Sequence, residues 1–346
     1  MQTANQKLLH NELQNLLKTL SISPSYLRPL KEASLDMPDG LRETEKVLST
    51  LYKAMLTIDP NIWQNKKRLV DAAGEQSSVG AYADTEIGQM RAIQEKKEEY
   101  RRESWSFLSR LKQFMVGALN KAEREMASRK SKDSTNIDVA ARNSFRQYLW
   151  IYNPLVLFAR EVSLDEWHAL INMYEQQARM PFQVDFRQNI QGWRNRMRPT
   201  TGEEQELLFT QQEKERESEG ITMAARKLTV KRSKTMKGTI HRSAGKIEPY
   251  EAFEGTLEET LNTISDEQNF VVQYFHLNSI SSADFPDLVA ASDPGKRPLP
   301  DFSVKQPHDP DRMMAKKVES TMDEIYSFWP PEMENFAESV WRDDPL

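Results

Sequence analysis

Residues 85–130 constrain the fold of this chain more than any other stretch, because they contain no proline and only two glycines. Apolar or small residues recur there every three or four positions, and one lysine fills the single polar slot of the series. The series consists of Ile93, Lys97, Tyr100, Ser104, Phe107, Leu111, Phe114 and Ala118. This spacing predicts one long amphipathic helix. At 1.5 Å per residue the helix would span roughly 65 Å, which favours an elongated structure built along it.

The composition argues against several classes of protein. The chain of 346 residues has 47 basic and 52 acidic side chains and a net charge of −5, which is unlike a chain that binds nucleic acid over its whole surface. Cysteine is absent, so disulfides and thiolate chemistry are excluded and a cytosolic location is favoured. The sequence has neither an apolar run of about 18 residues nor an amino-terminal signal, so we expect any membrane contact to be peripheral or through a partner.

Leucines near the start of the chain predict a coiled-coil helix. Leu9, Leu13, Leu16 and Leu20 step by four, three and four residues, which is the spacing of a coiled-coil seam. We therefore assign residues 1–22 to the end of a coiled coil that precedes the helical bundles. The seam either docks a helix of another chain or folds back onto the helices that follow it, since both arrangements bury the same face.

Residues 23–197 are predicted to form the first helical bundle or bundles, with the long helix at about 85–130 as their spine. Shorter helices are expected at about 26–35 and 41–58, and the segment Met37-Pro38-Asp39-Gly40 between them predicts a turn.

Aromatic residues are most frequent in residues 138–197, where their helical spacing favours core packing over a ligand cage. The pattern predicts a helical hairpin. Asn153-Pro154 and Pro181 are expected to kink its helices, and Ser163 begins a capping box that starts the second one. Asp138 or Asn136 is expected to cap the first.

Residues 198–250 are predicted to be a charged, flexible insert. Its second half is rich in basic residues and contains no acidic residue from 226 to 246. The basic residues are Arg226, Lys227, Lys231, Arg232, Lys234, Lys237, Arg242 and Lys246. Such a run either contacts an anionic surface, with phosphorylation of its hydroxyl residues as a switch, or is a solvated linker without a dedicated ligand.

Residues 251–346 are predicted to form a further helical bundle. One helix is expected from Gly255 to Leu277, with Leu257 and Leu261 on its apolar stripe. A proline-rich loop at 283–311 interrupts the bundle, and two last helices are expected at about 312–328 and 332–340. We expect the bundle to be truncated at its C-terminus.

The motifs of the common enzyme classes are missing from the sequence. We find no phosphate-binding glycine loop, no dinucleotide fingerprint and no serine nucleophile elbow. The five histidines have no second ligand at helical spacing, which argues against a metal site. His276 lies beside Phe275 in an apolar stripe and is expected to be a core or boundary histidine rather than a catalytic base. We therefore predict a protein that is not an enzyme and uses no cofactor or metal.

Three stretches resemble the Sec-three subunit family of the exocyst (exocyst component one), in its fungal form. They are Thr3-Ala4-Asn5-Gln6-Lys7-Leu8-Leu9 with the leucine seam, the block from Tyr148 to Tyr174, and the segment from Glu267 to Leu277. Within these, the resemblance is carried by Tyr152-Asn153-Pro154-Leu155, Trp167, Glu267-Gln268-Asn269-Phe270 and Tyr274-Phe275-His276-Leu277. The resemblance covers most of the chain outside the two loops.

The resemblance implies an all-α fold, an elongated rod of stacked helical bundles of the CATCHR type that follows a coiled-coil helix. It also implies a non-catalytic subunit that helps tether secretory vesicles to the plasma membrane before SNARE-mediated fusion. The partners would be other exocyst subunits, docked in part on the leucine seam. The chain would be cytoplasmic and recruited to sites of polarised secretion, with membrane association through the complex and no nucleic acid bound.

Members of this family also carry an upstream pleckstrin-homology-like domain that binds phosphoinositides and Rho-type GTPases. The resemblance places those contacts in that domain and not on residues of this chain. An alternative function remains open: a peripheral scaffold that binds anionic lipid or RNA through residues 226–246.

Overall fold

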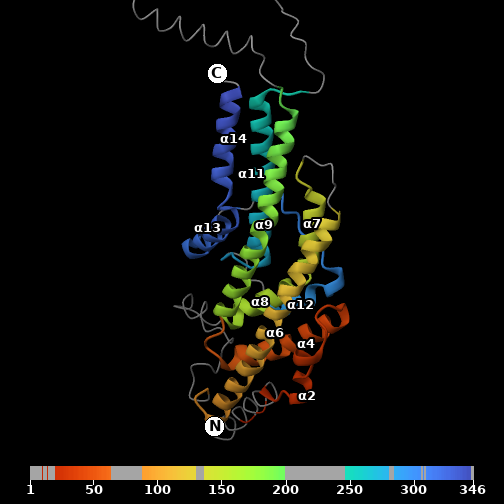
Figure 1. Ribbon diagram of the computed structural model, residues 1–346. Helices are drawn as coiled ribbons and strands as arrows, with labels where there is room; N and C mark the ends of the chain where they lie inside the picture. Colours follow the sequence, from red (N-terminus) through yellow and green to blue (C-terminus); the bar gives the residue numbers. More distant parts are fainter. Residues whose placement is uncertain are drawn as a thin grey trace, which may run out of the picture. The chain divides into compact units, whose positions relative to one another are not determined.

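The computed structural model describes residues 20–63, 88–129, 136–198, 246–279, 284–304, 307 and 309–343, together with His10 and Gln14. Within these ranges the regular structure is helical, apart from one isolated bridge between Met197 and Ile247. The predicted all-α fold is confirmed. The chain divides into two compact units, shown with their helix labels in Figure 1.

The first unit comprises residues 1–130, 138–179 and 265–325, and the second comprises 131–137, 180–264 and 326–346. Both units are therefore assembled from segments that lie far apart in the sequence. Two helices, α9 (Leu164–Arg196) and α11 (Pro249–Tyr274), contribute residues to both.

The long helix predicted at 85–130 is α6 (Arg91–Arg129). Its 39 residues span about 58 Å. The predicted stripe is buried at Ile93, from Tyr100 to Leu111 and again at Ala118, but Lys97 and Phe114 are half-buried and Met115 is the buried residue of the turn after Leu111. A straight helix has 3.6 residues per turn, so a strict alternation of four and three drifts around its surface by about 20° per heptad. The core accordingly follows the helix and not the alternation.

The segment before α6 forms three helices, α2 (Pro24–Leu27), α3 (Pro29–Glu32) and α4 (Pro38–Ile58). The prediction of one helix at about 26–35 is wrong, because Pro29 starts a new helix in the middle of that range. The turn predicted around Pro38 is also wrong. A proline fits the first turn of a helix, where its missing N–H has no partner to lose, and Pro38 begins α4.

The aromatic segment forms α7 (Val139–Trp150), α8 (Asn153–Val162) and α9. Asn153-Pro154 separates two helices instead of kinking one, for the same reason as at Pro38. The Asp138 carboxylate caps α7 by accepting from the Ala141 N–H at 2.9 Å, as expected. Helix α9 is assigned without interruption through Pro181.

The C-terminal segment contains α11, α12 (Phe285–Ala291), a 3-10 helix η1 (Pro294–Lys296), α13 (Arg312–Tyr326) and α14 (Trp329–Asp343). The proline-rich loop therefore holds two short helical pieces, each begun by a proline in its first turn. Helix α11 starts six residues earlier than predicted, at Pro249.

The core of the first unit is built along α6, which contacts α3, α4 and α7. Two polar contacts fix the register between α6 and the N-terminal helices. The Arg101 guanidinium binds the buried Asp59 carboxylate through both oxygens, at 2.6 and 2.7 Å. The Arg110 guanidinium binds two carbonyls of the α3 region, those of Leu30 and Ala33.

The second unit packs α9 from residue 180, α11 to residue 264 and α14 side by side, as Figure 1 shows. Aromatic side chains dominate its core, with Phe186 in ring contact with Phe182, Tyr326, Phe328 and Trp329. Ring contact between Phe253 and Phe336 joins α11 to α14. The predicted use of the aromatic residues as core is thus confirmed for the described chain.

Candidate interaction site

The C-terminus of α11 ends on a residue with left-handed backbone geometry. Helix α11 ends at Tyr274, and His276 has a φ of 54°. The Leu277 N–H then donates to the Val272 carbonyl at 2.9 Å, which is the closing bond of a Schellman motif. Glycine usually occupies this position because it lacks a Cβ, so a histidine here needs support from its surroundings.

Side chains from α8 and α9 provide that support by binding the last carbonyls of α11. Asn153 Nδ2 donates to the carbonyls of residues 273 and 274, each at 3.2 Å. Trp167 Nε1 donates to the Phe275 carbonyl at 2.9 Å, and an Arg160 nitrogen donates to the His276 carbonyl at 2.8 Å. We call Asn153, Arg160, Trp167 and His276 the cap cluster. It satisfies carbonyls that a helix end otherwise leaves without partners.

His276 is a core residue of this cluster. Its Nε2 lies 3.2 Å from the Asn153 carbonyl, and the side chain is buried. Burial, with a smaller contribution from the charge of Arg160, lowers the pKa of His276 to about 3. A neutral, buried imidazole held in this way is poorly suited to act as a base near neutral pH, in agreement with the sequence prediction of a core histidine.

Glu267 and Asn269 anchor the other face of α11 in the first unit. The Glu267 carboxylate accepts from Arg146 Nη2 of α7 at 2.9 Å and from the Tyr174 hydroxyl of α9. Asn269 Nδ2 donates to the Phe302 carbonyl at 2.6 Å and holds the loop after η1 against α11. The stretches that carry the family resemblance around 153, 167, 267 and 274 therefore meet in one buried region.

A second buried ion pair connects α4 to that loop. Arg297 donates from two nitrogens to the two carboxylate oxygens of Glu45, at 2.9 and 2.7 Å, and also to the Ile151 carbonyl. The two residues are only 5% and 1% exposed. Burial raises the pKa of Glu45, and the bond from Arg297 opposes that rise. Such a bidentate pair positions the loop; its carboxylate is committed to the guanidinium and is poorly placed for acid-base chemistry.

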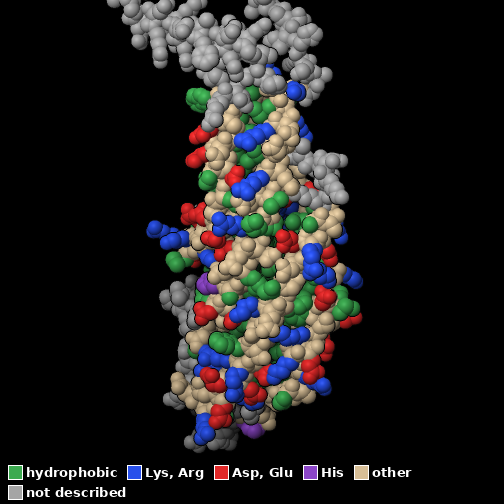
Figure 2. All heavy atoms as spheres, viewed as in Figure 1, with side chains coloured by type: hydrophobic (Ala, Val, Ile, Leu, Met, Phe, Trp, Pro, Cys, Tyr) green, Lys and Arg blue, Asp and Glu red, His purple; other side chains and the backbone are tan. Residues whose placement is uncertain are grey.

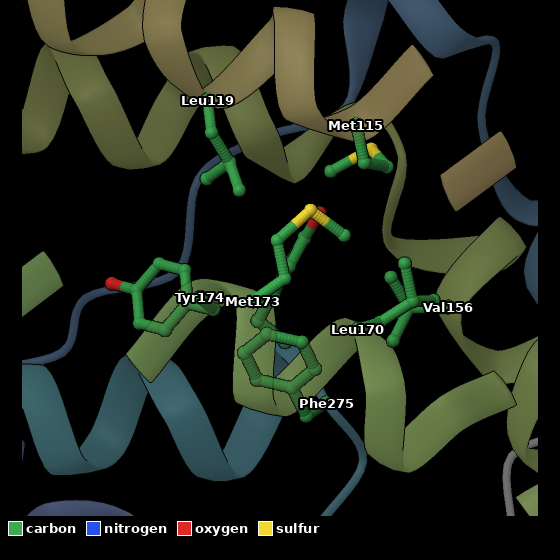
Figure 3. A pocket seen from close by; sticks show the side chains of 8 residues that line it. Met115, Leu119, Val156, Leu170, Met173, Tyr174 and Phe275 are labelled. Carbon is green, nitrogen blue, oxygen red and sulfur yellow. The ribbon is translucent and has the colours of Figure 1, made fainter. Parts of the chain in front are cut away.

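A small apolar hollow lies next to the cap cluster, between α6, α8, α9 and α11 (Figure 3). It has an empty volume of about 240 Å³, part of which is open to solvent. Its lining consists of Met115, Leu119, Val156, Leu170, Met173, Tyr174, Tyr274 and Phe275. Because the Tyr174 hydroxyl is bonded to Glu267, the lining offers a ligand little but apolar surface. The space inside it that a water molecule can occupy is only about 10 Å³, so the hollow is a packing gap and not a ligand site.

The seam and the basic run lie mainly outside the described residues. Leu20 is 3% exposed, and the Tyr100 hydroxyl donates to its carbonyl, so this end of the seam is buried against α6. Leu9, Leu13 and Leu16 are not among the described residues, and docking on the seam stays a prediction. In the basic run only Lys246 is described, and it is exposed.

One exposed surface was missed by the sequence analysis. Leu261 was predicted to lie on the apolar stripe of α11, but it is 50% exposed. The buried positions in this part of the helix are Ala252, Thr256, Thr260 and Thr263. Small residues are needed there because α9 approaches closely: a Cβ on Gly255 would lie 2.5 Å from the Trp193 ring. The absence of any Lys or Arg from residues 249–264 was the available signal that the opposite face is unusual.

The described part of the chain contains no group of three or more His, Cys, Asp or Glu residues arranged to hold a metal ion. Within the same residues, no helix is both long and apolar enough to cross a membrane.

The fold and its buried polar contacts define an all-helical scaffold within the described residues. The coiled-coil family model of exocyst complex component Sec3 matches residues 1–57, and the C-terminal family model of the same component matches residues 274–346. Both ends of the chain are therefore similar to the Sec3 component of the exocyst. Neither a curated protein nor a solved structure matches it. The second match begins at the last residue of α11 and so includes His276 of the cap cluster.

Proposed function

We propose that this chain is a non-catalytic subunit of the exocyst and helps tether secretory vesicles to the plasma membrane before SNARE-mediated fusion. The observation that carries the proposal is the pair of Sec3 family matches. The coiled-coil model matches the start of the chain and the C-terminal model matches its end. Packing of the family-like motifs around the cap cluster supports it, since the segment matched at 274–346 is then held by α8 and α9.

Other exocyst subunits are the proposed partners. Leu9, Leu13 and Leu16 are the proposed docking seam, and Leu20 at the end of the series is buried against α6. Contacts with phosphoinositides and Rho-type GTPases belong to a separate domain of the family and are not assigned to this chain. The protein acts in the cytoplasm at sites of polarised secretion and reaches the membrane through the complex.

The experiment compares the tagged full chain with a Leu13→Asp/Leu16→Asp variant. Burying two carboxylates in an apolar seam carries a desolvation penalty larger than the binding free energy that the seam contributes. We therefore expect at least a tenfold loss of co-purified exocyst subunits from a fungal lysate, measured by quantitative mass spectrometry. Val116→Asp is the matched control, because Val116 is an exposed aliphatic residue of α6. It should co-purify the same subunits as the wild type.

Three results would count against the proposal. If the wild-type chain co-purifies no exocyst subunit, it is not part of the complex. A double variant that loses its helical circular-dichroism signal places the seam inside the chain's own fold. Cells that depend on this protein should accumulate secretory vesicles when only the double variant is supplied, and normal secretion in those cells contradicts the tethering role.

A further inference from the structure

The second unit exposes large apolar side chains on two neighbouring helices. Tyr250 and Leu261 of α11 are 55% and 50% exposed, and Trp341 of α14 is 73% exposed. Leu257 of α11 and Ala337 of α14 are half-buried between them. We call these five residues the α11–α14 face. Exposed apolar residues are common singly, but a group on adjacent helices marks an interaction surface.

The contacts of α11 show that its part of this face points away from α9. Gly255 lies against Trp193 of α9, and Glu259 accepts from Asn189 of the same helix at 2.6 Å. At 100° per residue, Tyr250 and Leu257 are on the opposite side of α11 from Gly255 and Glu259.

The contacts of α14 lead to the same conclusion. Glu332 pairs with Arg187 of α9 at 2.5 Å, and Ser339 accepts from Arg194 at 3.1 Å. Residues 337 and 341 lie about 140–180° around α14 from these positions. Because the Phe253 and Phe336 rings are in contact, the two apolar stripes lie on helices that touch each other.

The helix directions place the two largest side chains at the same end of this face. Residues 189 and 193 of α9 meet 259 and 255 of α11, so these helices are antiparallel. Residues 187 and 194 meet 332 and 339, so α14 runs parallel to α9 and antiparallel to α11. Tyr250, near the start of α11, therefore lies close to the level of Trp341, near the end of α14.

The described charged side chains beside the apolar residues of this face are acidic. Glu254 and Glu258 of α11 and Glu334 and Glu338 of α14 are exposed and form no ion pair within the described chain. Residues 249–264 contain no Lys or Arg, and α14 contains one, Arg342, directly after Trp341. Figure 2 shows red and green side chains along the α14 edge of the view. The charge of Glu251, which is the largest cause, raises the pKa of Tyr250, as expected in a negative potential.

From this arrangement we propose that the α11–α14 face binds an amphipathic basic helix of another protein, with its apolar residues on Tyr250, Leu261 and Trp341 and its Lys or Arg residues beside the exposed glutamates. Two antiparallel helices can take a third helix against them with good packing, and opposite charges beside the contact select the partner. The inference is independent of the tethering role, because it depends only on the geometry and charge of the second unit.

The test measures fluorescence anisotropy of a synthetic helix of about 18 residues, roughly 27 Å long, with Leu and Phe on one side and Lys beside them. We expect the full chain to bind it, and to bind at least tenfold more weakly when salt rises from about 50 to about 200 mM. Leu261→Ala/Trp341→Ala and Glu254→Lys/Glu258→Lys should each weaken binding at least tenfold. These residues are exposed, so the variants should keep the wild-type melting temperature.

Trp105→Ala is the matched control, because Trp105 is a 63% exposed tryptophan on α6 of the first unit. It should bind the peptide as the wild type does, and a peptide with Glu in place of Lys should not bind. Equal binding by the wild type and the Leu261→Ala/Trp341→Ala variant overturns the proposal. A wild-type dimer in sedimentation that Trp341→Ala abolishes also overturns it, because another copy of the chain would then occupy the face. Peptide binding only after deletion of residues 226–246 overturns it as well, because this chain's own basic run would then be the occupant.

Discussion

Replacing Arg297 by Met tests whether the buried ion pair holds the 284–304 loop on the first unit. The substitution keeps most of the apolar volume but removes both bonds to Glu45 and the bond to the Ile151 carbonyl. Glu45 is 1% exposed, so its carboxylate is left buried without its guanidinium. Loss of one partner of such a pair costs about 3–5 kcal/mol. For a unit of this size that is a fall in melting temperature of roughly 6–20 °C.

The pH dependence of the loss has a defined sign. Burial already raises the pKa of Glu45 and Arg297 opposes that rise, so Arg297→Met raises the pKa further. A carboxyl with a raised pKa binds its proton more tightly in the folded chain than in the unfolded chain. The folded variant therefore gains stability relative to the wild type as the pH falls, and its deficit should be larger at about pH 8 than at about pH 5.5.

Thermal unfolding followed by circular dichroism at the two pH values measures both effects. A Glu45→Leu/Arg297→Met double variant is the control, because it leaves no buried charge and should come within about 2 kcal/mol of the wild type. A single variant as stable as the wild type, or one with the same deficit at both pH values, would refute the reasoning.

Two further predictions concern backbone and titration. Gly255→Ala should destabilise the second unit by about 1–3 kcal/mol, because its Cβ would lie 2.5 Å from the Trp193 ring. Gly117→Ala, on an open face of α6, should stabilise the chain by about 0.5–1 kcal/mol. Urea unfolding measures the change in unfolding free energy for each variant, and equal changes would disprove the close approach at Gly255. His276 has a pKa of about 3 against 6.5 for a free imidazole, so wild-type stability should decline as the pH falls from 6.5 toward 3. His276→Asn, which tolerates the positive φ, should lack that part of the slope in the same titration, and an unchanged slope would exclude His276 as its source.

Hydrophobic spacing was sufficient to predict the longest helices but not all of the short ones. Helix α6 begins six residues after its predicted start and ends one residue before its predicted end, since a long run without proline leaves few alternatives. Prolines misled the prediction near Pro29, Pro38 and Pro154, because a proline that ends one helix can equally occupy the first turn of the next.

The partners of the buried polar groups could not be predicted from the sequence. Spacing along one helix does not predict which distant carbonyl accepts a hydrogen bond from Trp167 or Asn153. The carbonyls that do so lie more than 100 residues further along the chain. The α11–α14 face was missed for a related reason. Leu261 fits the apolar stripe of α11 in the sequence. It is nevertheless exposed, because α9 packs closely against the helix at Gly255, on a different side from Leu261.

The cap cluster also sets an order of events during synthesis. Asn153, Arg160 and Trp167 leave the ribosome more than 100 residues before the carbonyls that they bind. At about 5–20 residues per second, the nascent chain spends several seconds with this end of the hairpin exposed before α11 can close on it. Contacts of such long range also slow the closure step itself. A chaperone that shields α8 and α9 during that interval would raise the yield of folded chain without stabilising the finished fold.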